Sequence, residues 1–326
     1  MRNLVLITID CLRADADTPE LNKLGGLRFT NAISASAQTP SSFSAMLSGW
    51  LPLDCGGRLK LNRSPRVGIA ERLKNQGYHT AGFHSNPWLS RVHGWDIGFD
   101  TYKDVAYKGR LYALAEEVDK AVKKWLRKAK QPFFLWVHYM DCHEPYRLEN
   151  MPERIEGKRE AYREAVATTD KHVVGLIEQL PSDTAIIVTA DHGQAFMEHG
   201  MHGHSHSLYE ELIHVPLVLI KGSTYNLEEQ RITSLLNIPT MLLWEAGVVD
   251  DSHSYRLGVA YSQLADWQDR DKLITGKLPR MSSLRTDTHK LITCEGKWPY
   301  FERDEVELYD LENDPEEKVN LWINTS

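Results

Sequence analysis

The stretch Ala185-Ile186-Ile187-Val188-Thr189-Ala190-Asp191-His192-Gly193 decides the fold class of this chain. Its first four residues form a short apolar run, mostly β-branched, which predicts a fully buried strand. Gly193 then allows the backbone to turn sharply. An Asp and a His at the carboxyl end of a buried strand stand where open α/β sheets bind their ligands, and both are ordinary ligands of divalent metals. Taken alone, the same pattern fits a turn with a capping Asp equally well.

A dense group of imidazoles follows this strand. The imidazoles belong to His199, His202, His204 and His206, and the carboxylate of Glu198 precedes them. So many imidazoles in one short segment indicate a polar, ligand-rich cleft more than a packed core. Either His199 or His202 could hold a second metal ion there.

A second strand with a terminal carboxylate opens the chain. Residues 4–9 are apolar and run directly into Asp10. Two carboxylates that end parallel strands, Asp10 and Asp191, could converge on one cation. The apolar run is too short for a signal peptide and is followed by no cleavage site, so we expect it to be the first strand of a cytoplasmic protein.

Composition excludes several classes of function. The chain has 326 residues, a net charge of -7 and no Lys/Arg-rich block, which argues against nucleic-acid binding. No apolar stretch approaches the length of a membrane span. The four cysteines are too few and too scattered for a disulfide scaffold, and we expect them to be reduced and structural: Cys11, Cys55, Cys142 and Cys294.

Strands and helices alternate along most of the chain. Strands are predicted over residues 4–9, 78–83, 133–137, 185–188 and 215–220, and helices over 67–76, 110–128, 161–180 and 232–246. This alternation predicts an α/β fold with a mainly parallel central sheet and helices on both faces. From about residue 255 the pattern changes to short strands joined by polar turns. We therefore expect a catalytic domain over residues 1–254 and a small C-terminal subdomain over 255–326, packed on it.

Thr39 begins a second informative stretch. Pro40 suits the first helical position, and an apolar face follows before Gly49 ends the helix, which places Thr39 at the N-cap. Its hydroxyl could simply cap the helix. Alternatively, it could point outward, where the helix dipole and free N–H groups stabilise an anion. Beside a divalent metal, such a hydroxyl would be a nucleophile for a phosphoryl or sulfuryl group.

Taken together, these motifs resemble the sulfatase-like branch of the alkaline phosphatase superfamily. The matching segments are Ile7-Thr8-Ile9-Asp10-Cys11-Leu12-Arg13, Gly77-Tyr78-His79-Thr80-Ala81, His143-Glu144-Pro145-Tyr146, Asp191-His192-Gly193, Tyr209-Glu210-Glu211 and the tail from Leu308 to Pro315. The resemblance runs the length of the chain and implies the α/β fold of that superfamily and metal-dependent ester hydrolysis.

The nucleophile helix is the most specific match and also the main departure. Counted back from Ser48-Gly49, Thr39 takes the place of the family's nucleophile, where sulfatases begin Cys-x-Pro-x-Arg. Sulfatases need a Cys or Ser there that is oxidised to formylglycine, and the oxidising enzyme reads the Pro and the Arg. This chain has Ser41 and Phe43 at those two places, so we do not expect the modification. A Thr nucleophile is typical of the phosphodiesterase and phosphoglycerol-transferase relatives.

The resemblance also assigns the remaining site residues. The implied metal ligands are Asp10, Thr39, Asp191 and His192; the implied catalytic residues are Thr39, His143 and His204; the implied substrate-binding residues are His143, His204 and His206. His143 matches the family's substrate-binding His. His204, or else His206, falls near the place of an expected Lys. Cys11 stands where many sulfatases have a further metal-binding Asp, so the usual calcium site is altered.

The expected function is hydrolysis of a small-molecule phosphate ester, either a monoester or a diester, through a phosphothreonine intermediate. One divalent metal ion is expected, with Mn, Ca, Mg and Zn all open. Two alternatives remain: a sulfatase or phosphonate-ester hydrolase that works through Thr39, and a non-catalytic metal-binding relative. The sequence indicates no particular oligomeric state.

Overall fold

The computed structural model describes residues 1–55, 67–105, 111–148, 151–155, 159–222, 231–248, 258–265, 280–296 and 305–322. In this part of the chain no helix combines the length and the apolarity that crossing a bilayer requires. The cytoplasmic location expected from the sequence stays a prediction.

An eight-stranded sheet forms the centre of the molecule, in the order β12-β2-β11-β8-β1-β5-β3-β4. Its strands are β1 (Asn3–Ile9), β2 (Leu27–Ile33), β3 (His79–His84), β4 (Thr101–Asp104), β5 (Phe133–Tyr139), β8 (Thr184–Ala190), β11 (His214–Ile220) and β12 (Thr233–Ser234). Only β11 runs antiparallel to its neighbours, β2 and β8. The predicted mainly parallel sheet is confirmed.

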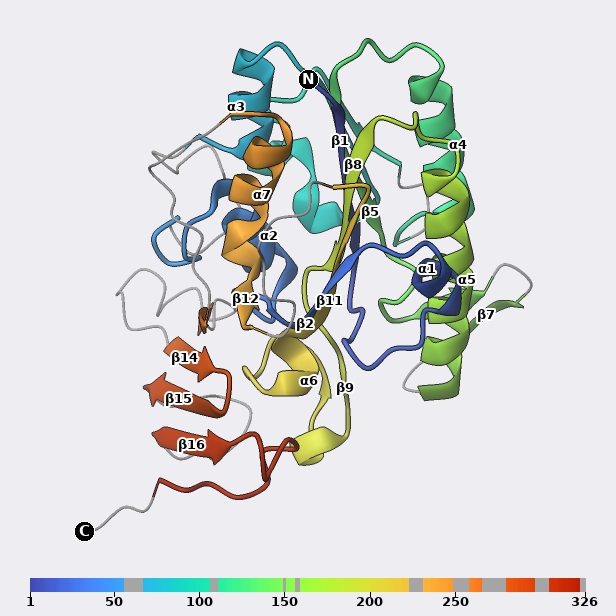
Figure 1. The fold of residues 1–326 in the computed structure, drawn as a ribbon. Helices are drawn as coiled ribbons and strands as arrows, with labels where there is room; N and C mark the ends of the chain where they lie inside the picture. Colours follow the sequence, from blue (N-terminus) through green and yellow to red (C-terminus); the bar gives the residue numbers. More distant parts are fainter. Residues whose placement is uncertain are drawn as a thin grey trace.

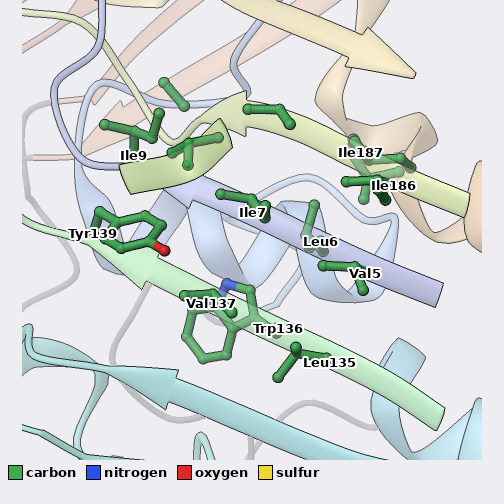
Figure 2. Packing of buried hydrophobic residues seen from close by; sticks show 14 of the residues in the cluster. Val5, Leu6, Ile7, Ile9, Leu135, Trp136, Val137, Tyr139, Ile186 and Ile187 are labelled. Carbon is green, nitrogen blue, oxygen red and sulfur yellow. The ribbon is translucent and has the colours of Figure 1, made fainter. Parts of the chain in front are cut away.

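The three central strands, β8, β1 and β5, carry the core. Every residue of each of these strands is buried, as expected of parallel strands covered on both faces. Figure 2 shows their aliphatic side chains packed together, with the Trp136 ring on β5 beside them. Trp136 donates its indole N–H to Thr8 Oγ1 at 3.0 Å, so these two buried polar groups are paired.

Helices cover both faces of the sheet, as predicted (Figure 1). One face carries α1 (Pro19–Lys23), α4 (Ala115–Leu126) and α5 (Arg159–Ile177); the other carries α2 (Thr39–Ser48), α3 (Ile69–Asn75) and α7 (Ile238–Glu245). The short helix α6 (Glu210–Ile213) precedes β11, and single 3-10 turns lie at η2 (Pro87–Leu89), η3 (Arg91–His93), η4 (Glu198–Gly200) and η5 (Leu235–Asn237).

Several predicted helix boundaries were wrong, including the end of the helix predicted over residues 161–180, which is α5 and ends at Ile177. Helix α4 starts at Ala115, where the Glu117 side chain accepts the Leu114 N–H at 3.1 Å and caps the first turn. The helix predicted over residues 232–246 begins only at Ile238, because residues 233–237 form β12 and η5 instead. Gln38, and not Thr39, precedes α2: the Gln38 carbonyl accepts the Ser42 N–H at 2.8 Å, which makes Thr39 the first helical residue.

A small antiparallel sheet follows, in the order β13-β14-β15-β16. Its strands are β13 (Val259–Ala265), β14 (Arg280–Thr286), β15 (His289–Glu295) and β16 (Val306–Asp310); two further ribbons pair β6 (Tyr146–Leu148) with β7 (Met151–Ile155) and β9 (Ala195–Phe196) with β10 (His202–Gly203). A second apolar cluster joins this sheet to the segment around α6, with Met281 and Ile292 among the same buried residues as Leu208 and Leu212. The predicted C-terminal element is present, whereas the boundary at 254/255 lies outside the described residues and stays a prediction.

Candidate active site

Four neighbouring parallel strands deliver the polar residues of the site at their carboxyl ends. Ile9 is in register with Tyr139 on one side and with Ala190 on the other. Asp10 and Asp191 therefore leave adjacent strands at the same level, and Asn86 follows β3 on the far side of β5. All three side chains are buried, as is His138 near the end of β5. The two strand-end carboxylates thus converge, as the sequence predicts.

Asp10 contacts side chains from three other elements. Asn86 donates from Nδ2 to Asp10 Oδ2 at 3.0 Å, His138 Nε2 lies 3.3 Å from that oxygen, and the Thr39 hydroxyl lies 3.4 Å from it. Sequence reasoning did not assign His138 or Asn86 to the site. The signal for both was present, because a polar residue at or just beyond a strand's carboxyl end was the criterion that selected Asp10.

Asp191 and His192 complete a compact, buried group. His192 Nε2 lies 3.4 Å from Asp191 Oδ2 and 3.9 Å from Asp10 Oδ1. Burial, with the nearby Asp10 carboxylate adding to it, raises the pKa of Asp191 to about 7. Burial lowers the pKa of His192, which favours the neutral imidazole that a metal needs.

Two buried carboxylates that lie side by side repel each other and are costly to bury, unless a positive charge between them offsets both effects. Asp191 Oδ2 has no hydrogen-bond partner in the described part of the chain. The donor atoms of Asp10, His138 and Asp191 all lie within 4.8 Å of one another, and the same holds for Asp10, Cys11 and His192. Carboxylate and imidazole donors at this spacing fit a divalent cation.

Helix α2 places Thr39 over this group. Ser42 donates to the Asp191 carbonyl at 2.7 Å, and Ser34 donates to the same carbonyl, which ties the first turn of α2 to the end of β8. The Thr39 Oγ1 atom then lies 3.1 Å from His192 Nε2. The Thr39 hydroxyl therefore faces the buried carboxylates and the imidazole at the amino end of a helix, where developing negative charge is stabilised.

A cavity of about 170 Å³ opens beside Thr39. It is lined by Gln38, Thr39, Pro40, Asn86, Pro87, Trp88, Leu111, Tyr112, Met140, His143, Glu144, His204 and Ser205. The rings of His143 and His204 lie 5.1 Å apart, and the His204 ring lies 4.4 Å from that of His192. Burial, and then the positive charge that His192 and His143 can carry, lowers the pKa of His204 well below its usual range. His204 is therefore neutral at physiological pH.

The remaining histidines of the imidazole-rich segment point elsewhere. His206 is absent from the residues that line the cavity, and its Nε2 lies 3.1 Å from the His202 carbonyl. His202 pairs with Glu144 at 2.8 Å. His199 stacks on Tyr209 with ring centroids 3.7 Å apart and lies, with Glu211 and Glu317, in a separate group of possible ligands. The structure thus brings His143 and His204 to Thr39, but not His206.

All four cysteines are free, and one of them lies in the site. The Cys11 thiol donates to Asp10 Oδ1 at 3.1 Å, and its Sγ is 3.6 Å from His204 Nδ1. Burial and the two neighbouring aspartates raise the pKa of this thiol well above its usual value. Cys142 instead contacts Thr169 Oγ1 at 3.6 Å and belongs to none of the groups of possible metal ligands among the described residues.

Comparison with known proteins identifies a protein family that matches most of the chain. A family model described as Sulfatase matches residues 2–248. Arylsulfatase K of Mus musculus is 25% identical over 257 residues, which cover 72% of this chain and 44% of the mouse protein. The chain thus spans less than half the length of that relative.

Solved structures share the fold at lower identity. The phosphonate monoester hydrolase of Agrobacterium radiobacter superposes with a TM-score of 0.75 at 16% identity, covering 100% of this chain and 92% of that one. A putative sulfatase from Bacteroides thetaiotaomicron gives a TM-score of 0.75 at 16% identity, covering 99% of this chain and 88% of that one. The predicted fold class and the predicted resemblance are both confirmed.

Proposed function

The chain belongs to the sulfatase family, and from this premise we propose that it is a metal-dependent hydrolase of phosphate esters in which Thr39 is the nucleophile. The observation that carries the proposal is the position of the Thr39 hydroxyl, 3.1 Å from His192 Nε2 and 3.4 Å from Asp10 Oδ2, on the wall of a cavity shared with His143 and His204.

Asp10, Asp191 and His192 would hold the metal ion, with Thr39 beside it. The unpartnered Asp191 Oδ2 and the shared burial of the two carboxylates support this ligand set. His138 and Asn86, which the sequence did not assign, both contact Asp10 Oδ2 and fix the orientation of that carboxylate. When bound, a divalent ion supplies Lewis acidity, which lowers the pKa of a nearby hydroxyl and offsets charge on the ester oxygens.

Thr39 would attack phosphorus in line, so that a bond from its Oγ1 to phosphorus forms while the bond to the leaving alcohol breaks. With a monoester, this step gives a phosphothreonine and a free alcohol; with a diester, the threonine phosphate keeps the second ester group. Attack of water at the same phosphorus then releases phosphate, or the remaining monoester, and restores the Thr39 hydroxyl. The amino end of α2 favours the negative charge that develops beside Thr39 in both steps.

His143 and His204 would serve the substrate directly: the neutral His204 by donating a hydrogen bond to a non-bridging oxygen, and His143 by holding another such oxygen or by supplying the proton that the leaving oxygen takes up. Both line the cavity next to Thr39. The His206 role implied by the resemblance has no such support, because His206 does not line this cavity. We therefore keep His143 and His204 as the substrate-binding residues.

Phosphate suits a threonine nucleophile better than sulfate does. A formylglycine hydrate can expel sulfate by breaking its own C–O bond. A threonine sulfate ester cannot eliminate sulfate in this way. The threonine ester must be broken by attack at the central atom, which a metal assists well at phosphorus. Thr39 and Phe43, at two positions that direct formylglycine formation in sulfatases, therefore favour a phosphoesterase.

Variants at Thr39 test the proposal. Thr39→Ala is expected to abolish turnover of an aryl phosphate ester while the protein stays folded and keeps its metal. Thr39→Ser is expected to retain activity, because a primary hydroxyl can attack the same phosphorus. Thr39→Cys is expected to gain no sulfatase activity, because Phe43 replaces the Arg that the modifying enzyme reads. Full activity in Thr39→Ala would contradict the proposal.

A phosphonate-ester hydrolase is the second candidate, because the phosphonate monoester hydrolase of Agrobacterium radiobacter shares the fold over the whole chain. Matched aryl phosphate monoesters, phosphate diesters, phosphonate esters and sulfate esters, assayed on one preparation, separate the candidates. The phosphoesterase proposal expects the phosphate esters to have the highest kcat/KM. A sulfate ester with the highest value would favour the sulfatase alternative.

A further inference from the structure

A second group of donors lies next to the proposed metal site. Cys11, His143 and His204 each offer a ligand atom, and these atoms lie within 4.8 Å of one another. They come from three separate parts of the chain: the turn after β1, the turn after β5, and the segment after β10. The proposed function uses the two imidazoles as direct substrate contacts and gives Cys11 no role.

The spacing of this group matches the coordination sphere of a zinc ion. With zinc–sulfur bonds of about 2.3 Å and zinc–nitrogen bonds of about 2.0–2.1 Å, tetrahedral geometry separates the two ligand atoms by about 3.6 Å. Cys11 Sγ and His204 Nδ1 are 3.6 Å apart. A cation on Nδ1 would displace the proton that this nitrogen can donate to Gln194 Oε1, 3.1 Å away.

His143 is oriented as a ligand would be. Its Nδ1 faces the backbone carbonyl of Glu144, a contact that holds the proton on Nδ1 and leaves the lone pair on Nε2. Histidines that bind metals commonly donate their other N–H in this way. Cys11 adopts a φ of +60°, in the left-handed region that non-glycine residues seldom adopt and that is found at functional sites.

We propose that Cys11, His143 and His204 form a second cation site with zinc as its occupant, beside the site of Asp10, Asp191 and His192. One thiolate and two imidazoles are softer donors than the carboxylate-rich first site, and such a set selects zinc over manganese, magnesium or calcium. Three protein ligands leave a fourth position open, as in catalytic zinc sites. His143 and His204 both line the cavity beside Thr39, so a substrate in that cavity could reach an ion that they hold.

The second cation would meet a need for positive charge. Among the described residues that line the cavity there is no Lys or Arg, although the substrate carries at least one negative charge. A cation held by Cys11, His143 and His204 would supply that charge. The two imidazoles would then act on the ester indirectly, by binding the cation that contacts it. The role of neutralising the substrate's charge rests on the proposed function, but the existence of the site does not. Metal binding can therefore be measured without turnover.

Cobalt substitution tests the site, because a cobalt–thiolate bond gives a charge-transfer absorption band in the near ultraviolet that oxygen and nitrogen ligands do not give. The full chain is stripped with a chelator, loaded with Co²⁺ and compared with its Cys11→Ala and Cys142→Ala variants. The band is expected in the wild type and in Cys142→Ala, a matched buried cysteine outside the group, and is expected to be absent from Cys11→Ala. A wild type without the band would overturn the proposal.

Two further variants assign the thiolate to one site or the other. The proposal expects His143→Ala, at a partly exposed position, to weaken or abolish the band, whereas Asp191→Asn should lose one equivalent of metal and keep the band. The reverse pattern would place Cys11 in the first site and overturn the second. Analysis of total bound metal after dialysis is expected to show two equivalents in Thr39→Ala, at least one of them zinc. Loss of activity in Thr39→Ala together with a single equivalent would uphold the proposed function and refute the second site.

Discussion

Asp10 shows how much of the site a single residue type reveals. A carboxylate directly after a buried strand was enough to predict Asp10 and Asp191, and Asp10 does lie at the centre of the polar group. His138 was left unassigned although the strand predicted over residues 133–137 places it just beyond a carboxyl end; in the structure β5 continues to Tyr139. Its contact with Thr8 depends on the register between β1 and β5, which no local pattern in the sequence encodes.

At the scale of single residues, the carboxyl group of Glu211 allows a prediction about the pH dependence of stability. Burial raises its pKa to about 6 from an ordinary 4.5; Glu198 adds to the shift, while Lys290 and Arg13 oppose it. The native state therefore binds more protons than the unfolded chain between about pH 4.5 and pH 6, and stability falls as the pH rises through that window.

A shift of this size corresponds to about 2 kcal/mol. Glu211→Gln removes the titration, so the stability of the variant relative to wild type is expected to rise by up to about 2 kcal/mol between pH 4 and pH 8. Denaturant unfolding of both proteins at the two pH values measures this. An identical pH dependence in the two proteins would show that Glu211 does not titrate in this window.

At the scale of elements, α2 and the turn after β8 hold the site together. The apolar face and Pro40 predicted α2 correctly, but its first residue was misplaced by one position, because the helix begins when the Gln38 carbonyl accepts the Ser42 N–H. The turn after β8 depends on Gly193, whose N–H donates to the Leu212 carbonyl at 2.8 Å. A Cβ atom at residue 193 would lie 2.1 Å from the Glu211 carbonyl oxygen, so only glycine fits there.

Gly193→Ala is therefore expected to destabilise the protein by about 1–3 kcal/mol and to weaken metal binding, because Asp191 and His192 directly precede the displaced turn. Gly175→Ala is the matched control. No atom lies within 4 Å of a Cβ built at residue 175 in α5, and alanine gains up to about 1 kcal/mol in a helix. Thermal unfolding and metal analysis of both variants check the pair, and equal stability would contradict this account of the turn.

At the scale of the whole molecule, alternation of strands and helices predicted the layered architecture but not the order of the strands. Strand β2 was not predicted, because polar residues interrupt its apolar pattern; in the sheet it lies between β11 and β12. Strand β11 pairs antiparallel with β8 after a connection that contains β9, β10 and α6, and local propensity does not reveal this direction. The coupling of the C-terminal sheet to α6 depends on contacts between residues far apart in the sequence.

Lys290 is central to that coupling. Its side chain on β15 is fully buried, with Nζ 3.0 Å from Glu210 Oε1 and 2.9 Å from Glu317 Oε1. Removing one partner of a buried ion pair leaves an uncompensated charge, so Lys290→Met is expected to lower the free energy of unfolding by about 3–5 kcal/mol. Lys318→Met, at an exposed position, is the control and is expected to cause no measurable change. Denaturant unfolding measures both; equal values would show that the network does not stabilise the molecule.

Covalent chemistry at Thr39 is the central step of the proposed function, and mass spectrometry of protein quenched in acid during turnover of an aryl phosphate ester tests it most directly. We expect the peptide that contains Thr39 to gain one phosphate group in the wild type and to remain unmodified in Thr39→Ala. A phosphate group on another residue, or active wild-type protein that never carries one on Thr39, would contradict the account.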